Sequence, residues 1–363
     1  MFFLMFQAGG KVNLSMICLY FAAAVSIALN DIPPFFKPWA RLGTFIMLTL
    51  VVSPSIAGKY AAVFKVRLFS SSVWLLFLAT VLSICSLFLG TGRGFLTPWF
   101  QGVMNHSMIM GPVAVLCMLF CLYQLQSINC KNRLRYIFIA ILIGAFLCLL
   151  QAGSRAALIG GIVSSASFLY FRYKSSLSRV LSRFIIVISL LLLSFPLWSS
   201  SAENIIKKNQ GNTSALDTSS RAGHWEQRIQ EWSSSPVYGI GFATVDTEAE
   251  NSTYNASTGG IETGSSWLSV LSMTGTLGGI CIFIIFLSAM VKCWKLLHKK
   301  PALGAFLISL MIFFIFHMTA EGYIFAGGNF LNTLLWLIIG TIYSVSHYSQ
   351  YATELDRELQ LAR

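Results

Sequence analysis

Charged residues are scarce in this chain. Only 10% of its 363 residues are Asp, Glu, Lys or Arg, whereas 56% are hydrophobic, and a soluble globular domain carries about a quarter charged residues. Apolar runs of about 18 or more residues recur along the whole length, which is typical of transmembrane helices. The composition therefore excludes a soluble globular protein and predicts an all-α, polytopic membrane protein.

Cysteine motifs and internal repeats are also missing. The eight Cys form no CxxC pair, and none lies in the one long polar segment, so the sequence predicts neither a paired metal site nor a disulfide framework. The first residues lack the basic region of a secretory signal peptide, and we expect the first apolar segment to be retained. No internal repeat is visible, which disfavours a transporter built from inverted repeats.

About ten apolar segments are expected to cross the membrane. They are residues 12–29, 39–57, 72–90, 103–125, 134–152, 156–171, 183–199, 266–290, 303–320 and 325–347. The net charge of +12 comes mostly from Lys and Arg in short connections between these segments, not from one basic patch. That distribution follows the positive-inside rule and excludes nucleic acid as a partner.

The basic connections also predict the topology. They follow the second, fourth, sixth and eighth segments, contain no acidic residue, and carry Lys59, Lys65, Arg67, Lys131, Arg133, Arg135, Arg172, Lys174, Arg179, Arg183, Lys292, Lys295, Lys299 and Lys300. The positive-inside rule places these connections and both termini in the cytoplasm. We therefore expect seven spans in residues 1–199, a large outer loop at 200–265, three spans in 266–347 and a cytoplasmic tail at 348–363.

The outer loop contains a predicted amphipathic helix at residues 221–232. At helical spacing its apolar face carries Trp225, Ile229 and Trp232. A second face carries Arg221, His224 and Arg228. The apolar face is expected to rest on the membrane interface or on the spans below, with the cationic face turned to the space above them. Such a helix either only anchors the loop at the interface or reads phosphate groups through its arginines.

Two further arginines are expected on the outer side. Arg155 begins the sixth apolar segment in the sequence Gly153-Ser154-Arg155-Ala-Ala, and Arg93 lies in the loop before the fourth segment. An arginine at the end of an apolar run either extends to the interface or binds an anion in a membrane cavity.

Acidic residues and a histidine are expected near the same side. His317 and Glu321 have i, i+4 spacing at the outer end of the ninth segment, where they form either a structural polar pair or part of a functional site. Glu262 precedes the eighth segment, whose helix Ser265 or Ser266 would cap, and it is a candidate general base. Together with the arginines, these residues indicate a site for a membrane-embedded anion with a polar head group.

The order of these features resembles the O-antigen ligase and polymerase superfamily. The resemblance runs from about Gly92 to Trp336 and rests on short motifs in the expected order. They are Ser154-Arg155-Ala-Ala-Leu, Ser220-Arg221 with Trp225, Pro236-Val-Tyr-Gly239-Ile-Gly241-Phe242, Trp267-Leu268, Leu271-Ser-Met-Thr-Gly275-Thr-Leu-Gly278, and Glu321 in a late span.

The resemblance implies a metal-independent glycosyltransferase of the bacterial inner membrane that needs no cofactor. Such proteins move a glycan from undecaprenyl pyrophosphate to an acceptor hydroxyl at the periplasmic face. The acceptor is another glycan or lipid A core, and a chain-length regulator is a possible partner. By position, the resemblance makes Arg155 and Arg221 pyrophosphate ligands, followed by Arg228 and Arg93.

The resemblance identifies the catalytic base less directly than the phosphate ligands. Many ligases of this superfamily have a histidine where the loop re-enters the membrane, whereas this chain has Gly264-Ser265-Ser266-Trp267 there. Glu262, His224 and Glu321 are therefore the candidate catalytic residues. The missing histidine favours a polymerase or a divergent member over a typical ligase.

Three other functions remain open from the sequence. A peptidoglycan polymerase with ten spans would share the topology, but its motifs are not seen. A lipid-linked oligosaccharide flippase would carry polar residues near the middle of the bilayer, whereas here they lie at the outer edge. A non-catalytic subunit for polysaccharide assembly would use the loop only to bind a partner.

Overall fold

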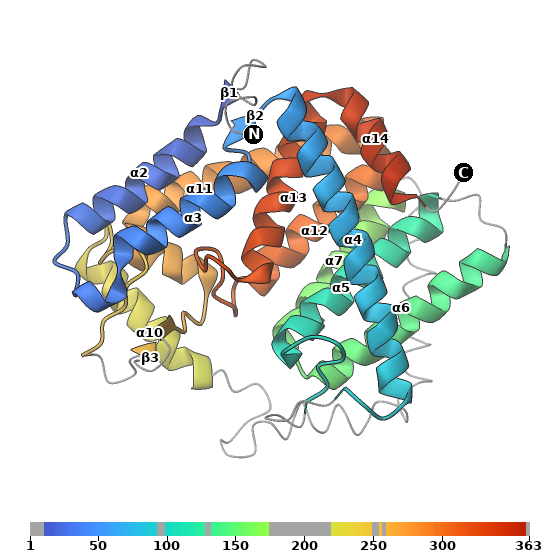
Figure 1. The fold of residues 1–363 in the computed structure, drawn as a ribbon, viewed down its shortest axis with the longest axis horizontal. Coiled ribbons are helices and arrows are strands. Elements are labelled where there is room, and N and C mark those ends of the chain that lie inside the picture. The colour runs from blue at the N-terminus through green and yellow to red at the C-terminus, as the bar shows by residue number, and fades with distance from the viewer. Residues whose placement is uncertain are drawn as a thin grey trace. The chain divides into compact units, whose positions relative to one another are not determined.

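The computed structural model of the protein describes most of the chain (Figure 1). The described residues are 11–92, 99–127, 132–173, 219–248, 254–255 and 259–360. Several parts of the sequence prediction lie outside them: Arg93, the expected span at 183–199, residues 200–218, 249–253 and 256–258 of the outer loop, and Lys131, Lys174, Arg179 and Arg183 of the basic connections.

The described residues are almost entirely helical. The helices are α2 (Leu14–Ala28), α3 (Pro38–Val52), α4 (Lys59–Phe88), α5 (Ser107–Ser127), α6 (Asn132–Ala152), α7 (Arg155–Tyr173), α10 (Ser219–Ser234), α11 (Ser266–Lys299), α12 (Pro301–His317), α13 (Phe330–His347) and α14 (Ser349–Leu359). A 3₁₀ turn covers Pro34–Phe36. The strands form two short antiparallel pairs, β1 (Lys11–Val12) with β2 (Ile56–Ala57) and β3 (Tyr254–Asn255) with β4 (Gly260–Ile261).

Several of these helices can cross a membrane. Within the described ranges six segments are long and apolar enough: Pro34–Val52, Lys59–Phe88, Ser107–Gln126, Arg133–Ala152, Ser266–Lys299 and Phe330–His347. Helices α2 and α12 are apolar but shorter. The protein is therefore an all-α, multi-pass membrane protein, as the composition predicts.

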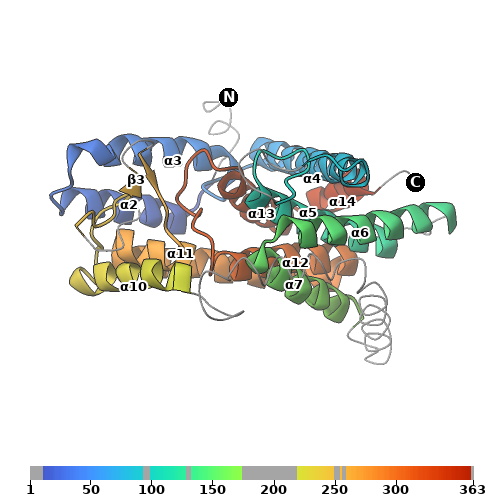
Figure 2. The same ribbon diagram turned by 90° about the horizontal axis from the view of Figure 1, so that it is seen from below.

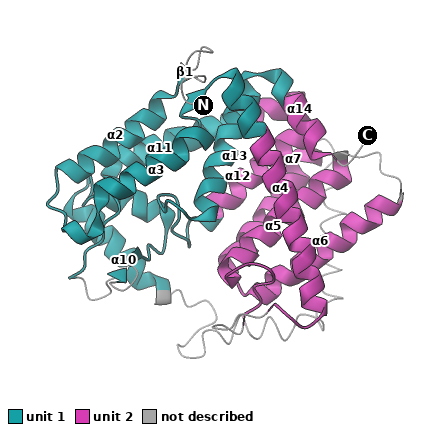
Figure 3. Cartoon of the chain, in the orientation of Figure 1, with its two compact units in different colours: residues 1–66, 218–292, 317–351 teal, residues 67–217, 293–316, 352–363 magenta. Residues whose placement is uncertain are grey.

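The chain folds into two compact units, coloured separately in Figure 3. Unit 1 comprises residues 1–66, 218–292 and 317–351, and unit 2 comprises residues 67–217, 293–316 and 352–363. In unit 2, α5 packs against both α6 and α7. Residues of α14, in the expected cytoplasmic tail, are fixed there because Ser70 donates to Glu358 at 2.6 Å and Tyr123 donates to Asp356 at 2.6 Å.

The core of unit 1 is aromatic and centres on Phe45 of α3. Its fully buried ring lies 5.4 to 6.0 Å, between centroids, from the rings of Tyr20, Phe242, Phe325 and Trp336. These rings come from α2, the segment after α10, the α12–α13 connection and α13. Phe242, the last residue of the glycine-containing motif after α10, therefore anchors that segment in the core.

Helix α11 is broken at Gly275, where φ is 63° and ψ is −168°. Only glycine adopts this conformation readily, and a Cβ here would overlap the Val237 carbonyl. The break frees backbone groups inside an apolar segment, which must find partners within the protein. The backbone amides of Thr276 and Leu277 donate to the carbonyls of Pro236, at 2.9 Å, and Val237, at 3.2 Å.

The first half of α11 is held in the same way. The Ser272 carbonyl accepts a hydrogen bond from the Ile240 amide at 2.8 Å, and the Met273 carbonyl accepts one from Ser26 Oγ at 2.5 Å. The two glycine motifs noted in the sequence therefore pack directly on each other. This contact sets the position of α10, which lies beside the first half of α11 (Figure 2).

Candidate functional site

Helix α10 forms where the sequence predicts a helix and extends two residues further at each end, from Ser219 to Ser234. Its faces are not the expected ones. Ile229 of the predicted apolar face is 47% exposed, whereas Gln227, Arg228 and Glu231 are buried. The prediction that the cationic face turns outward is wrong for Arg228, because an acidic residue one turn later neutralises it and lets it be buried.

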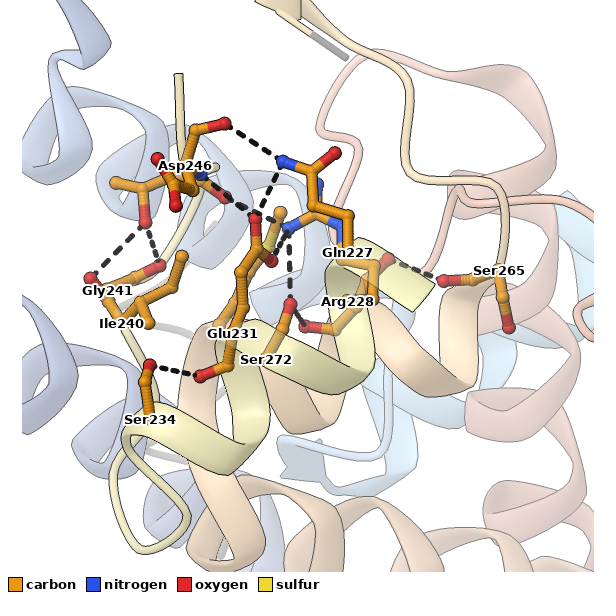
Figure 4. Close-up of polar contacts among 12 residues, drawn as sticks. Gln227, Arg228, Glu231, Ser234, Ile240, Gly241, Asp246, Ser265 and Ser272 are labelled. Carbon is orange, nitrogen blue, oxygen red and sulfur yellow. Dashed lines mark hydrogen bonds and ion pairs between the residues drawn. The ribbon is translucent and has the colours of Figure 1, made fainter. Parts of the chain in front are cut away.

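Arg228 is enclosed by protein contacts (Figure 4). Only 1% of its surface is exposed, and Nη1 donates to Glu231 Oε2 at 2.9 Å, Ser272 Oγ at 3.1 Å and the Thr244 carbonyl at 3.2 Å. Burial lowers the pKa of Arg228 from its ordinary value, and the Glu231 carboxylate opposes that shift. These contacts tie α10 to α11 and to the segment after α10.

The second oxygen of Glu231 extends this buried network. Glu231 Oε1 accepts hydrogen bonds from the Asp246 amide at 2.9 Å and from Gln227 Nε2 at 3.1 Å. Gln227 Nε2 also donates to the Asp246 carbonyl at 2.9 Å. Because a buried carboxylate is costly unless all its bonds are made, the network fixes residues 240–246 against α10.

Arg221, at the other end of α10, lies in a more open place. Its Nη2 contacts Glu321 Oε1 at 2.7 Å, and its Nη1 donates to the Gly264 carbonyl at 3.4 Å. Trp225 Nε1 donates to the same carbonyl at 3.2 Å. The side chains of Arg221 and Glu321 are 28% and 19% exposed. Helix α10 is thus attached at this end to the point where the loop re-enters the membrane segment.

His224 lies against Gly264 as well. Gly264 has φ of 63°, and a Cβ added to it would be 2.9 Å from the His224 Cβ. Only glycine therefore allows this close approach. In the described part of the chain His224 Nδ1 is buried without a hydrogen-bond partner. Glu262 is exposed and stands two residues before Gly264, so its backbone lies within about 7 Å of it.

Glu321 is positioned by the start of α11. Ser266 Oγ donates to the Glu321 carbonyl at 2.7 Å and accepts from the Tyr323 amide at 3.0 Å, while the Ser266 amide donates to the Met318 carbonyl at 2.9 Å. Because these bonds engage the backbone after α12, that helix ends at His317. His317 and Glu321 therefore do not share a helical face, contrary to the sequence prediction.

Tyr323 completes the support of this connection. Its hydroxyl lies 3.1 Å from His317 Nδ1. Burial raises the pKa of Tyr323 well above its ordinary value, and the nearby Glu321 carboxylate raises it further. The hydroxyl therefore stays protonated, and the negative charge at this place belongs to Glu321.

The geometry thus gathers Arg221, His224, Glu321 and the chain next to Glu262 around Gly264. Residues 138–283, which include three of these four side chains, match the O-antigen ligase family model. The match covers less than half of the chain and places this region in the O-antigen ligase family. This confirms the resemblance found in the sequence and implies membrane glycan transfer of the ligase and polymerase type. No curated protein matches the chain.

Arg155 also falls within the matched O-antigen ligase region but belongs to unit 2. It is the first residue of α7, and the preceding Ser154 accepts a hydrogen bond through Oγ from the Ala157 amide at 3.4 Å. A cation at the positive end of a helix is unfavourable. Among the described residues no hydrogen bond or ion pair holds the Arg155 guanidinium.

Some residues of the candidate site around Gly264 were not singled out from the sequence. Gly264 is central because its carbonyl receives both Arg221 and Trp225. Gly322 is a second close approach, since a Cβ there would overlap Thr263. A glycine next to a helix start gives some signal, but the pairing of loop and connection does not show in local sequence. In the described ranges no group of three His, Cys, Asp or Glu is arranged to hold a metal ion.

Proposed function

We propose that this protein is a glycosyltransferase that moves a glycan from undecaprenyl pyrophosphate to an acceptor hydroxyl. The reaction takes place at the periplasmic face of the bacterial inner membrane, with both termini of the chain in the cytoplasm. The observation that carries the proposal is the partly exposed Arg221, held between Glu321 and the Gly264 carbonyl. An arginine in this setting has a carboxylate that a phosphate can replace.

Arg221 suits a pyrophosphate because only one of its two terminal nitrogens makes a short contact within the protein. Its one short contact, from Nη2 to Glu321, is 2.7 Å long, while the contact to Gly264 is stretched to 3.4 Å. A guanidinium binds two phosphate oxygens in parallel, which a single carboxylate contact does not match. Bound in this way, Arg221 stabilises the negative charge that develops on the leaving pyrophosphate, without a metal ion.

The acceptor is activated next to Gly264. Its hydroxyl oxygen attacks the anomeric carbon, the bond from that carbon to the phosphate oxygen breaks, and the pyrophosphate leaves with the electron pair. A base takes the hydroxyl proton. We assign this base to His224. The residues at the loop end include no histidine, but the fold brings His224 of α10 against Gly264 there. Glu262 is the other candidate base, and Glu321 orients Arg221 until the donor arrives.

The acceptor in this proposal is a lipid-linked glycan, and the product is a longer surface polysaccharide. Loss of a polymerase leaves single repeat units on the lipid A core, whereas loss of a ligase leaves finished chains on the lipid carrier. Gel analysis of polysaccharide from a deletion strain separates the two outcomes. The same strain tests whether chain length depends on a separate regulator protein.

The substitutions Arg221→Ala, His224→Ala and Glu262→Ala test the site, with Arg155→Ala as a separate test of a second phosphate ligand. Each variant is expressed in the deletion strain, its amount in the membrane is measured, and the surface polysaccharide is resolved by length. Glu226→Ala, an exposed carboxylate of the same helix, is the matched control. Polymer of wild-type length and amount from Arg221→Ala would contradict the mechanism.

The same experiment distinguishes the two candidate bases. Loss of polymer in His224→Ala, with activity kept in Glu262→Ala, supports His224. The reverse result moves the role to Glu262 without affecting Arg221.

A further inference from the structure

A pocket of about 500 Å³ opens in unit 1, beside α10 and away from Gly264. Its walls are the turn at residues 31–36, the second half of α10 and residues 240–248. This volume lies within the roughly 300–1,000 Å³ range of small-molecule sites. The phosphate chemistry at Arg221 makes no use of it.

The pocket is acidic. Its walls include Asp31, Glu231, Asp246 and Glu248 but no Lys or Arg. Glu231 is neutralised by Arg228, whereas in the described parts of the chain the other three carboxylates form no ion pair. Asp246 Oδ1 instead accepts a hydrogen bond from the Glu248 amide at 2.9 Å. A ligand with phosphate or carboxylate groups would be repelled here.

The remaining walls suit a ligand that is rich in hydroxyl groups. Carboxylates and the Gln230 amide oxygen accept hydrogen bonds from hydroxyls, and Pro33 and Ile32 supply apolar surface for carbon–hydrogen faces. In the described residues the carboxylates do not group as metal ligands. Uncharged sugar rings combine these two kinds of surface.

Gln227 is held inside the same wall of the pocket. Its side chain is only 4% exposed and its Nε2 is bonded to Glu231 and Asp246. Its Oε1 is buried and has no partner in the part of the chain that the structure describes. Figure 4 shows this oxygen turned away from Glu231 and Asp246. Because this oxygen is closed to solvent, the exposed Gln230 and Asp31 are the wall residues that can meet a ligand.

The pocket and Arg221 are close enough along α10 for one glycan substrate to reach both. Gln230 is nine residues further along α10, which corresponds to about 13 Å of helix rise. We propose that this pocket binds uncharged sugar units of the glycan while Arg221 binds the phosphate, so that α10 carries the phosphate site at one end and the sugar site at the other. The assignment to the glycan substrate rests on the function proposed above.

The test uses the full chain in lipid nanodiscs. The probe is the lipid-free repeat-unit oligosaccharide released by mild acid from the surface polysaccharide of the same cells, and saturation-transfer NMR measures its binding. Gln230→Ala and Asp31→Ala remove acceptors from exposed pocket walls, Glu226→Ala is the control on the same helix, and Arg221→Ala removes the phosphate ligand. Each pocket variant should weaken binding about fivefold, as for loss of one hydrogen bond.

The outcomes separate this inference from the proposed function. Oligosaccharide binding that survives Arg221→Ala and Glu226→Ala but weakens in both pocket variants supports the pocket. Equal binding by the wild type and the pocket variants overturns it, even if Arg221→Ala abolishes glycan transfer. Calcium binding that both pocket variants abolish, together with no oligosaccharide binding by the wild type, overturns it in favour of a cation site. If transfer persists in Arg221→Ala, the proposed function fails, whatever the pocket binds.

Discussion

Arg221 and Arg228 stand two turns apart on the same side of α10 but lie in opposite surroundings. Arg228 is 1% exposed and bonds to a carboxylate, a carbonyl and a hydroxyl. Arg221 is 28% exposed and has one short contact, to Glu321. The same residue type therefore serves as internal support at one end of the helix and as an available cation at the other.

The partners of the two arginines differ as well. Glu231 follows Arg228 by three residues on the same helix, so this pair forms as soon as α10 forms. Glu321 is 100 residues away from Arg221 and reaches it only when the α12–α13 connection has packed on the start of α11. A contact that depends on the tertiary fold and remains partly open to solvent is the easier one for a ligand to exchange.

The largest effect is expected from breaking the buried pair. Glu231→Ala leaves the Arg228 charge buried without its partner, which should lower the free energy of unfolding by about 3–5 kcal/mol. Thermal unfolding of the purified protein in detergent measures the loss. Glu226→Ala, on the exposed side of the helix, should change stability by less than about 0.5 kcal/mol. Equal melting temperatures for the two variants would show that the Arg228 network does not support the fold.

Arg221→Ala should have the opposite effect, with little change in stability and a large loss of activity. Its ion pair is partly exposed and contributes only about 0–1 kcal/mol to stability, so the melting temperature should hardly change. Glycan transfer should fall by about 10²–10³-fold, as for removal of one donor to a developing negative charge. Arg221→Lys keeps the charge but loses the parallel donors, and it should recover only part of the rate. A large drop in melting temperature would make Arg221 a structural residue like Arg228.

Several features of this comparison could be predicted from the sequence. The apolar spacing of Trp225 and Ile229, together with the serines at both ends, predicts α10. The motifs around Arg155 and Arg221 indicate the resemblance to the O-antigen ligase family. The sequence prediction does not include the burial of Arg228, although the residue types around it indicate that burial. Gln227, Arg228 and Glu231 form a polar stripe that neutralises itself, and such a stripe can face a protein interior when other segments complete its hydrogen bonds.

The arrangement around Gly264 could not be read from local sequence. The spacing of His317 and Glu321 suits a continuous helix, but α12 ends at His317 because Ser266 binds the backbone beyond it. In the same way, no local pattern shows that His224 reaches the loop end, where the sequence itself lacks a histidine. Both facts depend on contacts between segments that are distant along the chain.

The next largest effect concerns the support beneath the Arg228 end. Gly275→Ala forces a side chain into a conformation that costs about 1–3 kcal/mol for strain alone, and its Cβ would also overlap the Val237 carbonyl. Thermal unfolding should show a clear loss of stability. Gly43→Ala in α3 is the matched control, because no atom lies within 4 Å of its added Cβ. An unchanged melting temperature for Gly275→Ala would mean that the break in α11 is not required.

The smallest effect tests the Arg221 end without touching a charge. Trp225→Phe keeps an aromatic ring but removes the Nε1 donor to the Gly264 carbonyl, which should cost about 1 kcal/mol. Trp232→Phe removes a similar bond, to the Pro236 carbonyl at 3.3 Å, from an exposed place on the same helix. Both variants lose one ring nitrogen, so they differ mainly in whether the loop end is involved. If Gly264 positions Arg221 and His224, Trp225→Phe should slow glycan transfer several-fold relative to Trp232→Phe. Equal rates would show that the Trp225 bond to Gly264 does not help to position Arg221.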